Sequence, residues 1–167
     1  MCLCDWGEAV LEPDNIAARI AVQPLGLRAP EVMVSAKPLW GSAIDIWSLG
    51  PLILETVENR SMFYCYTKDG VYDRMAHLRE IVGLLGPFPQ SLLDLGEQDI
   101  VSCPELRLSS SKDLGDRIHI TKDEDKNELK AFLMEVMVID PTCRPTATQL
   151  IDNVWFESAF PSRLRAD

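Results

Sequence analysis

A chain of 167 residues, 47% of them hydrophobic, is long enough for one domain whose core buries roughly two thirds of the unfolded surface. The net charge of −10 argues against nonspecific binding to nucleic acid, which depends on Lys and Arg neutralising phosphates. It suits either a basic partner or simple solubility. No apolar run approaches the ~20 residues that cross a bilayer, so no membrane segment is predicted.

The cysteines indicate a reducing compartment. They are odd in number and scattered, so they suggest no disulfide framework, and the first pair lacks a second pair at zinc-ligand spacing. The start of the chain is neither basic nor followed by the apolar core of a signal peptide. We therefore expect a cytoplasmic or nuclear protein with reduced thiols at Cys2, Cys4, Cys65, Cys103 and Cys143.

The first 31 residues contain a short apolar stretch and two turn-like motifs. Residues 1–4 are typical of a strand, and Asp5-Trp6-Gly7 follows directly. Taken alone, an Asp-x-Gly sequence is most often a plain turn. Residues 8–28 contain no Ser, Thr or Tyr, which excludes a phosphate-operated switch within them. The second motif, Arg28-Ala29-Pro30-Glu31, places charged residues beside a proline.

Residues 42–58 predict the central helix of the domain. Ser42 can cap its start, and the apolar residues that follow leave no wide polar face, a pattern typical of a helix buried on nearly all sides. Asp45 is anomalous there, because a buried carboxylate needs hydrogen-bond donors. Pro51 lies inside the helix, where a proline costs ~3 kcal/mol or bends the helix.

Residues 73–85 predict an amphipathic helix that ends at Gly86-Pro87. We expect His77 at a partly solvated edge of it. Residues 87–124 then form a connection that is unusually long for a compact domain. Its run Ser109-Ser110-Ser111 predicts an exposed tip that is able to accept phosphate, although serine runs in loops are usually only solvated.

The C-terminal part predicts two more helices. Residues 128–139 are amphipathic, and Asp140-Pro141-Thr142-Cys143-Arg144-Pro145 forms a turn-rich loop after them. Thr146 and Gln149 have the spacing of a capping box that opens a last helix, ended by Pro161. The side chains expected to face the core from this last helix are Leu150, Ile151, Val154, Trp155 and Phe156.

The order of these motifs resembles the C-terminal lobe of a eukaryotic Ser/Thr protein kinase. In that family an Asp-Phe-Gly element precedes Ala-Pro-Glu, an Asp-x-Trp-Ser-x-Gly helix and a late Arg. Asp5-Trp6-Gly7, Ala29-Pro30-Glu31, the helix with Asp45 and finally Arg144 follow the same order. Each match is weak, and the four together cover nearly the whole chain. Arg28 before Ala29 is typical of the branch that holds cyclin-dependent, MAP and SR-protein kinases, and fungal SR-protein kinases are the most similar.

The resemblance implies a mainly α fold with a buried central helix, a long insertion loop and no N-terminal β-lobe. The whole of residues 1–167 would be one partial kinase domain. Its parts would be a metal-binding element and activation segment over 5–31, the central helix over 42–58, the insertion over 86–125 and the final helices over 127–160.

The resemblance also assigns roles to single residues. Asp5 would bind Mg²⁺ on the phosphates of ATP, and Gly7 would permit the turn behind it. Glu31 and Arg144 would form a buried ion pair, the alternative being two independent surface charges. Asp45 would accept backbone amides of the catalytic loop.

Substrate positioning falls on Gly26, Leu27 and Arg28. The family usually carries a Thr and a Tyr in this stretch, and residues 23–28 have neither. A basic, Arg/Ser-rich protein is the substrate that the resemblance implies. In SR-protein kinases the helix aligned with residues 73–85 carries acidic residues for basic docking peptides, but Ala76 and Gly83 stand at those positions.

Several parts that phosphoryl transfer requires have no counterpart in the sequence. These are a Gly-rich loop, a phosphate-clamping Lys and a catalytic loop with its Asp base, so no catalytic residue is assigned. We expect the isolated chain to be inactive, and to expose an apolar face that the missing lobe or a partner would cover. The alternatives are a fragment of a longer kinase, a noncatalytic kinase-like binding or scaffold module (a pseudokinase), and an unrelated helical domain.

Overall fold

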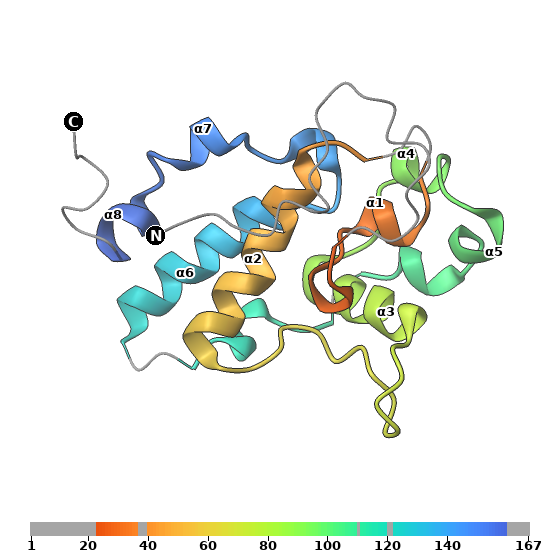
Figure 1. Ribbon diagram of the computed structural model, residues 1–167, viewed down its shortest axis with the longest axis horizontal. Helices are drawn as coiled ribbons and strands as arrows, with labels where there is room; N and C mark the ends of the chain where they lie inside the picture. Colours follow the sequence, from red (N-terminus) through yellow and green to blue (C-terminus); the bar gives the residue numbers. More distant parts are fainter. Residues whose placement is uncertain (1–22, 37–39, 110, 120–121, 160–167) are drawn as a thin grey trace.

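The computed structural model describes residues 23–36, 40–109, 111–119 and 122–159, and these residues are mainly helical (Figure 1). They contain no strand beyond a single antiparallel bridge between Tyr66 and Tyr72. No described helix is long and apolar enough to cross a membrane. The elements in chain order are the 3₁₀ turn η2 (Leu25–Leu27), α1 (Pro30–Met33), α2 (Ala43–Glu58), α3 (Arg74–Leu85), α4 (Gln90–Leu93), α5 (Gln98–Val101), η3 (Pro104–Arg107), η4 (Leu114–Arg117), α6 (Asp123–Val136), η5 (Pro141–Cys143), α7 (Ala147–Leu150) and α8 (Val154–Ala159).

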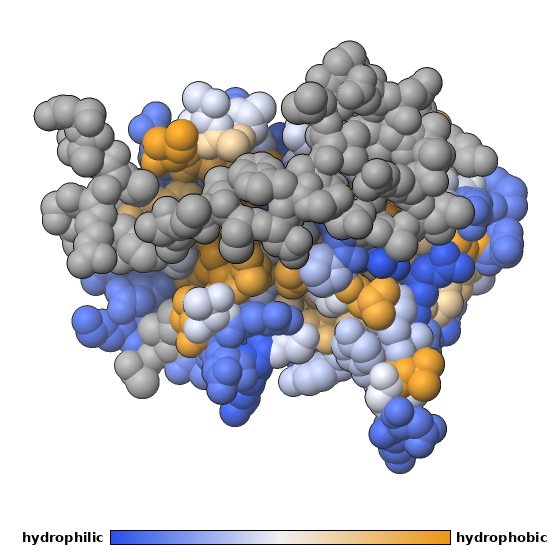
Figure 2. All heavy atoms as spheres, viewed as in Figure 1, coloured by the Kyte–Doolittle hydropathy of each residue, from blue (hydrophilic) through white to orange (hydrophobic). Residues whose placement is uncertain are grey.

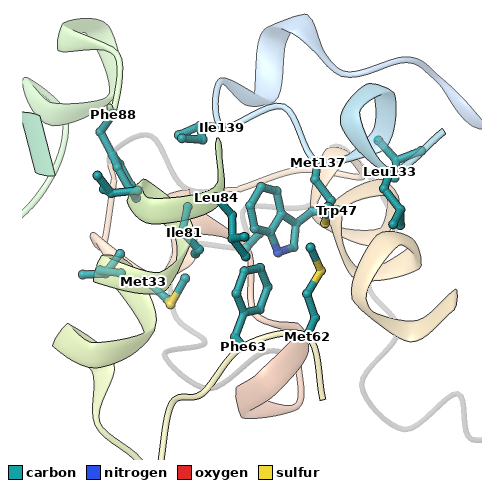
Figure 3. Close-up of a cluster of buried hydrophobic side chains, with 14 of the residues drawn as sticks. Met33, Trp47, Met62, Phe63, Ile81, Leu84, Phe88, Leu133, Met137 and Ile139 are labelled. Atoms are coloured by element: carbon teal, nitrogen blue, oxygen red, sulfur yellow. The ribbon is translucent and has the colours of Figure 1, made fainter. Parts of the chain in front are cut away.

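Helix α2 occupies the middle of the described fold and packs lengthwise against α6 (Figure 1). Gly50 permits the close approach, because a Cβ built there would lie 2.5 Å from Cγ of Met137 and 3.1 Å from Cγ2 of Val136. Trp47 fills the core on the next turn, fully buried and stacked on Phe63 with ring centroids 6.3 Å apart (Figure 3).

The expectation that α2 is buried on nearly all sides is wrong. Its buried residues follow one stripe at helical spacing, while Leu52 is 48% and Val57 43% exposed. Figure 2 shows hydrophobic side chains reaching the surface in the middle of the molecule among hydrophilic ones. The apolar residues on the second face of α2 have no neighbour to bury them fully within the described part of the chain. The stripe consists of Ile44, Trp47, Gly50, Pro51 and Leu54.

Neither Ser42 nor Pro51 affects α2 in the way that the sequence predicts. Ser42 makes no capping bond from its side chain, because its own backbone is already helical, with φ −55° and ψ −20°. Pro51 does not end the helix, which is assigned without interruption from Ala43 to Glu58. The proline ring is buried on the core stripe, and its apolar packing offsets part of the lost hydrogen bond.

Helix α3 begins and ends as the sequence predicts. The Asp73 carboxylate accepts a hydrogen bond from the Ala76 amide at 2.9 Å, which caps the first turn. Gly86 ends the helix with a φ of +96°, a backbone conformation that residues with a side chain rarely adopt. The expected position of His77 is wrong, because its side chain is fully buried.

The long connection after α3 contains short helices instead of an extended loop. Elements α4, α5, η3 and η4 all fall within it, so most of its backbone groups bond locally. Its apolar residues extend the core, and Phe88 lies beside α3 in the close-up of Figure 3. The buried residues of this stretch include Phe88, Leu92, Leu93, Ile100, Val101, Leu106, Leu114 and Ile118.

Helix α6 starts five residues before the predicted helix, with three acidic residues in its first turn that interact favourably with the helix dipole. The capping box of Thr146 and Gln149 is confirmed. It opens only the single turn α7, however, and α8 begins separately. As a result Ile151 and Val154 are 62% and 65% exposed, so their expected burial is wrong. Pro161 lies outside the described residues.

Candidate functional site

The segment before Ala29 is held against the first half of α2 by a single glutamine side chain. Gln23 Nε2 donates to the Ile44 carbonyl at 2.9 Å and to Ser48 Oγ at 2.6 Å. Its Oε1 accepts from the Ala29 amide at 3.0 Å. Both N–H groups and the oxygen of this side-chain amide are therefore hydrogen-bonded. The two N–H groups bind residues of α2, and the oxygen binds the end of the segment at Ala29.

Two further contacts close the same segment. Ser48 Oγ donates to the Leu27 carbonyl at 2.9 Å, and Arg28 Nη2 donates to the Gln23 carbonyl at 3.2 Å. The enclosed residues Leu25–Leu27 form the turn η2, which packs on α2. The structure thus brings Gly26, Leu27 and Arg28 together in one compact loop, which is held by neutral hydrogen bonds and one guanidinium. We call residues 23–28 the glutamine-locked loop.

Gln23 adopts a backbone conformation that is unfavourable for a residue with a side chain. Its φ is +67°, in the left-handed region. Such a conformation costs of order 1–3 kcal/mol and persists only where the surroundings enforce it. The hydrogen bonds of its side chain are what enforce it here. The sequence predicts Gly26, Leu27 and Arg28 as the functional residues of this loop, whereas the residue that locks it is Gln23.

We expect Gln23→Ala to open the glutamine-locked loop. Amide exchange at Ala29 and Leu27 should accelerate by at least about tenfold, because the variant loses the acceptor of the Ala29 amide and two donors to α2. Hydrogen exchange read by NMR measures this directly. Gln23→Glu is the matched variant, since it keeps the shape and the acceptor but removes both donors. Unchanged exchange at Ala29 in both variants, with α6 amides as the internal reference, would contradict the lock.

The ion pair expected between Glu31 and Arg144 is present and buried. Arg144 Nη1 lies 2.6 Å from Glu31 Oε1 and Nη2 lies 2.8 Å from Oε2, a bidentate arrangement. The two side chains are 4% and 0% exposed. Arg144 also donates to three backbone carbonyls, and its guanidinium lies 5.1 Å from the centroid of the Trp47 ring. These carbonyls belong to Ala43, Val138 and Ile139.

Asp45 is exposed, so its expected burial is wrong. It lies in the first turn of α2, one residue from Ile44 and therefore off the buried stripe. A carboxylate there is stabilised by the positive end of the helix dipole and does not need a buried partner. Asp45 still interacts within the chain. Whether it also receives the amides of a catalytic loop stays a prediction.

The expected nucleotide and metal residues, Asp5 and Gly7, lie outside the described residues. Their roles toward ATP and Mg²⁺ stay predictions. Within the described part of the chain, no group of three or more His, Cys, Asp or Glu side chains is arranged to hold a metal ion. The site that the structure does describe is therefore the glutamine-locked loop and its support.

A buried polar cluster, missed by the sequence argument, lies behind α1. The Tyr72 hydroxyl lies 3.1 Å from His77 Nδ1 and 3.4 Å from Sδ of Met33. Burial, reinforced by the charge of Arg28, lowers the pKa of His77 to about 4, and burial raises the pKa of Tyr72 to about 12. Both rings are neutral at pH 7. The available signal was spacing, because His77 is in helical register with the buried Ile81 and Leu84.

Comparison with known proteins identifies the family. The model of the protein kinase domain matches residues 1–156. The chain is similar to the serine/threonine-protein kinase SKY1 of Saccharomyces cerevisiae, with 30% identity over 155 residues that cover 84% of this chain and 20% of SKY1. It is 28% identical over 152 residues to the serine/threonine-protein kinase SRPK of Physarum polycephalum, covering 84% of this chain and 35% of that protein.

A third relative carries a different name. It is the glycogen synthase kinase-3 homolog YGK3 of Saccharomyces cerevisiae, 28% identical over 156 residues, which are 93% of this chain and 38% of YGK3. The chain thus spans between a fifth and two fifths of the length of these relatives. The match over residues 1–156, with the helical arrangement around α2, shows that this chain belongs to the protein kinase domain family and has the fold of its C-terminal lobe.

Proposed function

We propose that this chain is the helical lobe and substrate loop of a Ser/Thr kinase that transfers the γ-phosphate of ATP to Arg/Ser-rich proteins. The observation that carries the proposal is the glutamine-locked loop, which is joined to α2 by three hydrogen bonds from Gln23 and Ser48. The loop leads directly into α1, where Glu31 pairs with Arg144. A rigid loop on a rigid lobe is what positioning a peptide requires.

The residues proposed to position the substrate are Gly26, Leu27 and Arg28. All three are partly buried. Gly26 and Leu27 lie in η2, and Arg28 is the residue that caps its C-terminal end. None of them carries a hydroxyl. The residue beside the reacting serine would therefore contact apolar atoms and backbone of this loop. The net charge of −10 supports a basic substrate through long-range attraction. Such a kinase would act in the cytoplasm or nucleus.

We also propose that this chain alone does not transfer phosphate. Asp5 is the one metal ligand that the sequence offers at the position of the family motif, and ATP with Mg²⁺ is the proposed cofactor. The sequence contains no His-Arg-Asp triplet to supply a catalytic base. Positioning and charge stabilisation both depend on the absent groups, and together they supply nearly all of the catalysis of phosphoryl transfer.

A chimera tests the proposal. The part of SKY1 that precedes its match to this chain is fused to residue 1, and transfer of labelled phosphate from Mg-ATP to an Arg/Ser peptide is measured. We expect transfer by the chimera and none above background by this chain alone. Asp5→Ala in the chimera should reduce transfer by at least about 100-fold, since the metal ligand is lost.

The control for the chimera is a measurement of folding. Each variant is checked by thermal unfolding, so that inactivity of a folded chimera can be told from failure to fold. Transfer by the chain alone would contradict its proposed inactivity. A folded chimera that binds the Arg/Ser peptide but transfers nothing would instead support a noncatalytic binding or scaffold module.

That second candidate, a pseudokinase, rests on a specific observation. Leu52 and Val57 expose about half of their side chains on α2, which offers an apolar surface to a partner. The partner proposed first is the N-terminal lobe of a kinase. A regulatory protein that covers the same face is the alternative, and it predicts binding without phosphate transfer.

A further inference from the structure

Two cations from the connection after α3 converge on one carboxylate of that helix. Lys112 Nζ pairs with one oxygen of Glu80, and Arg117 Nη2 pairs with the other. The guanidinium of Arg117 also lies 4.3 Å from the centroid of the Tyr64 ring. Glu80 and Arg117 are only about 15% exposed, whereas Lys112 is 42% exposed. Lys112 is therefore the solvent-accessible and exchangeable member of this cluster.

The backbone at Ser111 and Lys112 is also bonded to α3. The amides of Ser111 and Lys112 donate to the Gly83 carbonyl at 3.0 and 2.9 Å, so the backbone of this segment lies along α3. On the other side, Lys130 of α6 pairs with Asp113 at 2.6 Å. The segment is thus anchored to two helices at once, while the Ser111 side chain is exposed.

A hollow of about 320 Å³ lies between these helices, and Ser111, Lys112 and Lys130 all line it. This volume is at the small end of ligand pockets and is ample for one phosphate group. Its other lining residues are Leu84, Asp113, Leu114 and Met134. Asp113 is the acidic member, and both its lysine partner and its capping bond to the Gly115 amide hold its pKa below the ordinary range.

The balance of charge at this hollow is opposite to that of the whole protein. Of the charged residues that line it, Lys112 and Lys130 are cations and Asp113 is a carboxylate. In a chain with a net charge of −10, this local positive excess is fit to hold an anion.

We propose that Ser111 is a phosphorylation site and that Lys112 and Lys130 capture the phosphate in this hollow. The donor is a nucleoside triphosphate, used by a separate Ser/Thr kinase. Ser111 Oγ attacks the γ-phosphorus, the bond to the β–γ bridging oxygen breaks, the diphosphate leaves, and the hydroxyl proton passes to the base of that kinase.

The captured phosphate changes which groups hold the segment. A phosphate carries ≈ −1.5 to −2 charge at pH 7 and three acceptor oxygens, so it competes with Glu80 for Lys112 and with Asp113 for Lys130. Glu80 keeps Arg117, and Asp113 keeps the Gly115 amide at 2.7 Å. The modified serine then ties the connection after α3 to α6 through two charged groups, which regulates how firmly it is held. This inference does not depend on the proposed function.

The capture is tested with phosphoserine installed genetically at position 111. In ³¹P NMR, its second ionisation is expected about one pH unit below the ordinary value of about 6, because two ammonium groups favour the dianion. The melting temperature should rise by about 2–4 °C. The same phosphoprotein unfolded in urea is the reference, because its phosphoserine has no fixed cation beside it and should titrate normally.

Two further experiments test the proposal, one with lysine variants and one with protein from cells. Lys112→Gln with Lys130→Gln should return the phosphoserine titration to that of the unfolded reference, and thermal unfolding verifies that the double variant is folded. A normal titration at position 111 in the unsubstituted chain would overturn the capture. Phosphopeptide mapping of the protein from its native cells should find phosphate on Ser111, and its absence there would overturn the modification.

Discussion

Arg144→Ala is expected to lower the free energy of unfolding by about 3–5 kcal/mol, the cost of breaking a buried ion pair from one side. The Glu31 side chain is only 4% exposed, and in the variant it loses both of its guanidinium contacts. It also deprives three carbonyls of donors and removes the cation that faces Trp47. Denaturant unfolding at pH 7, read by tryptophan fluorescence, measures the loss.

The matched control is a second Arg–Glu pair on the surface of the same lobe. Arg79 and Glu105 are joined at 3.2 Å and are 50% and 43% exposed, so Arg79→Ala should cost no more than about 1 kcal/mol. Arg144→Lys keeps the charge but not the two parallel bonds, and should fall between the two. If Arg144→Ala costs no more than Arg79→Ala, burial does not make this pair important.

The pair matters beyond its own energy because of what it joins. Glu31 lies in α1, which is separated from the glutamine-locked loop by the single residue Ala29. Arg144 binds the start of α2 through the Ala43 carbonyl and the end of the α6 region through Val138. One guanidinium therefore joins α1, which follows the proposed substrate loop, to the start of α2 and to the segment after α6. We expect Arg144 variants to loosen residues 23–28 even where the lobe stays folded.

Some of the fold could be predicted from the sequence because local rules determine it. Helix α3 has an Asp that caps it and a Gly that ends it, and both residues act alone on their own turn. The capping box of Thr146 and Gln149 is equally local. The pair of Glu31 with Arg144 spans 113 positions and could be predicted only from the family motif order.

The features that were missed depend on packing between distant segments. Periodicity cannot tell which face of the largely apolar helix α2 has neighbours, so the exposure of Leu52 and Val57 could not be predicted. The role of Gln23 arises from Ile44 and Ser48, more than 20 residues away. The Ser111 hollow likewise needs α3 and α6 to come together.

The burial of His77, which the sequence does not predict, affects the stability of the protein in solution. Its ring is buried against Phe63, with centroids 4.7 Å apart, and meets the Tyr72 ring edge-on. Nδ1 faces the Tyr72 hydroxyl, while Nε2 has no hydrogen-bond partner among the described residues. Protonation would place a cation with an unpaired donor in this apolar setting, close to the positive charge of Arg28. The folded state therefore keeps His77 neutral.

We expect the protein to lose about 3 kcal/mol of stability between pH 6.5 and pH 4 through His77 alone. The pKa of this ring is about 4 in the folded state and 6.5 without the protein environment. Across this window the unfolded chain binds a proton that the folded chain does not, so stability falls as the pH falls. Above pH 6.5 both states are neutral at this position, and the contribution is complete and constant.

Denaturant unfolding of wild type and His77→Gln at several pH values from 7.5 to 4 measures this contribution. The glutamine stays neutral and can still accept a hydrogen bond from Tyr72, so it removes the titration with little change of shape. Carboxylates titrate in both proteins, and the difference between the two curves isolates the histidine. A His119→Gln background leaves His77 as the single histidine for NMR titration, since the chain has two. Parallel stability curves over the whole range would show that the buried ring is not what makes this lobe sensitive to acid.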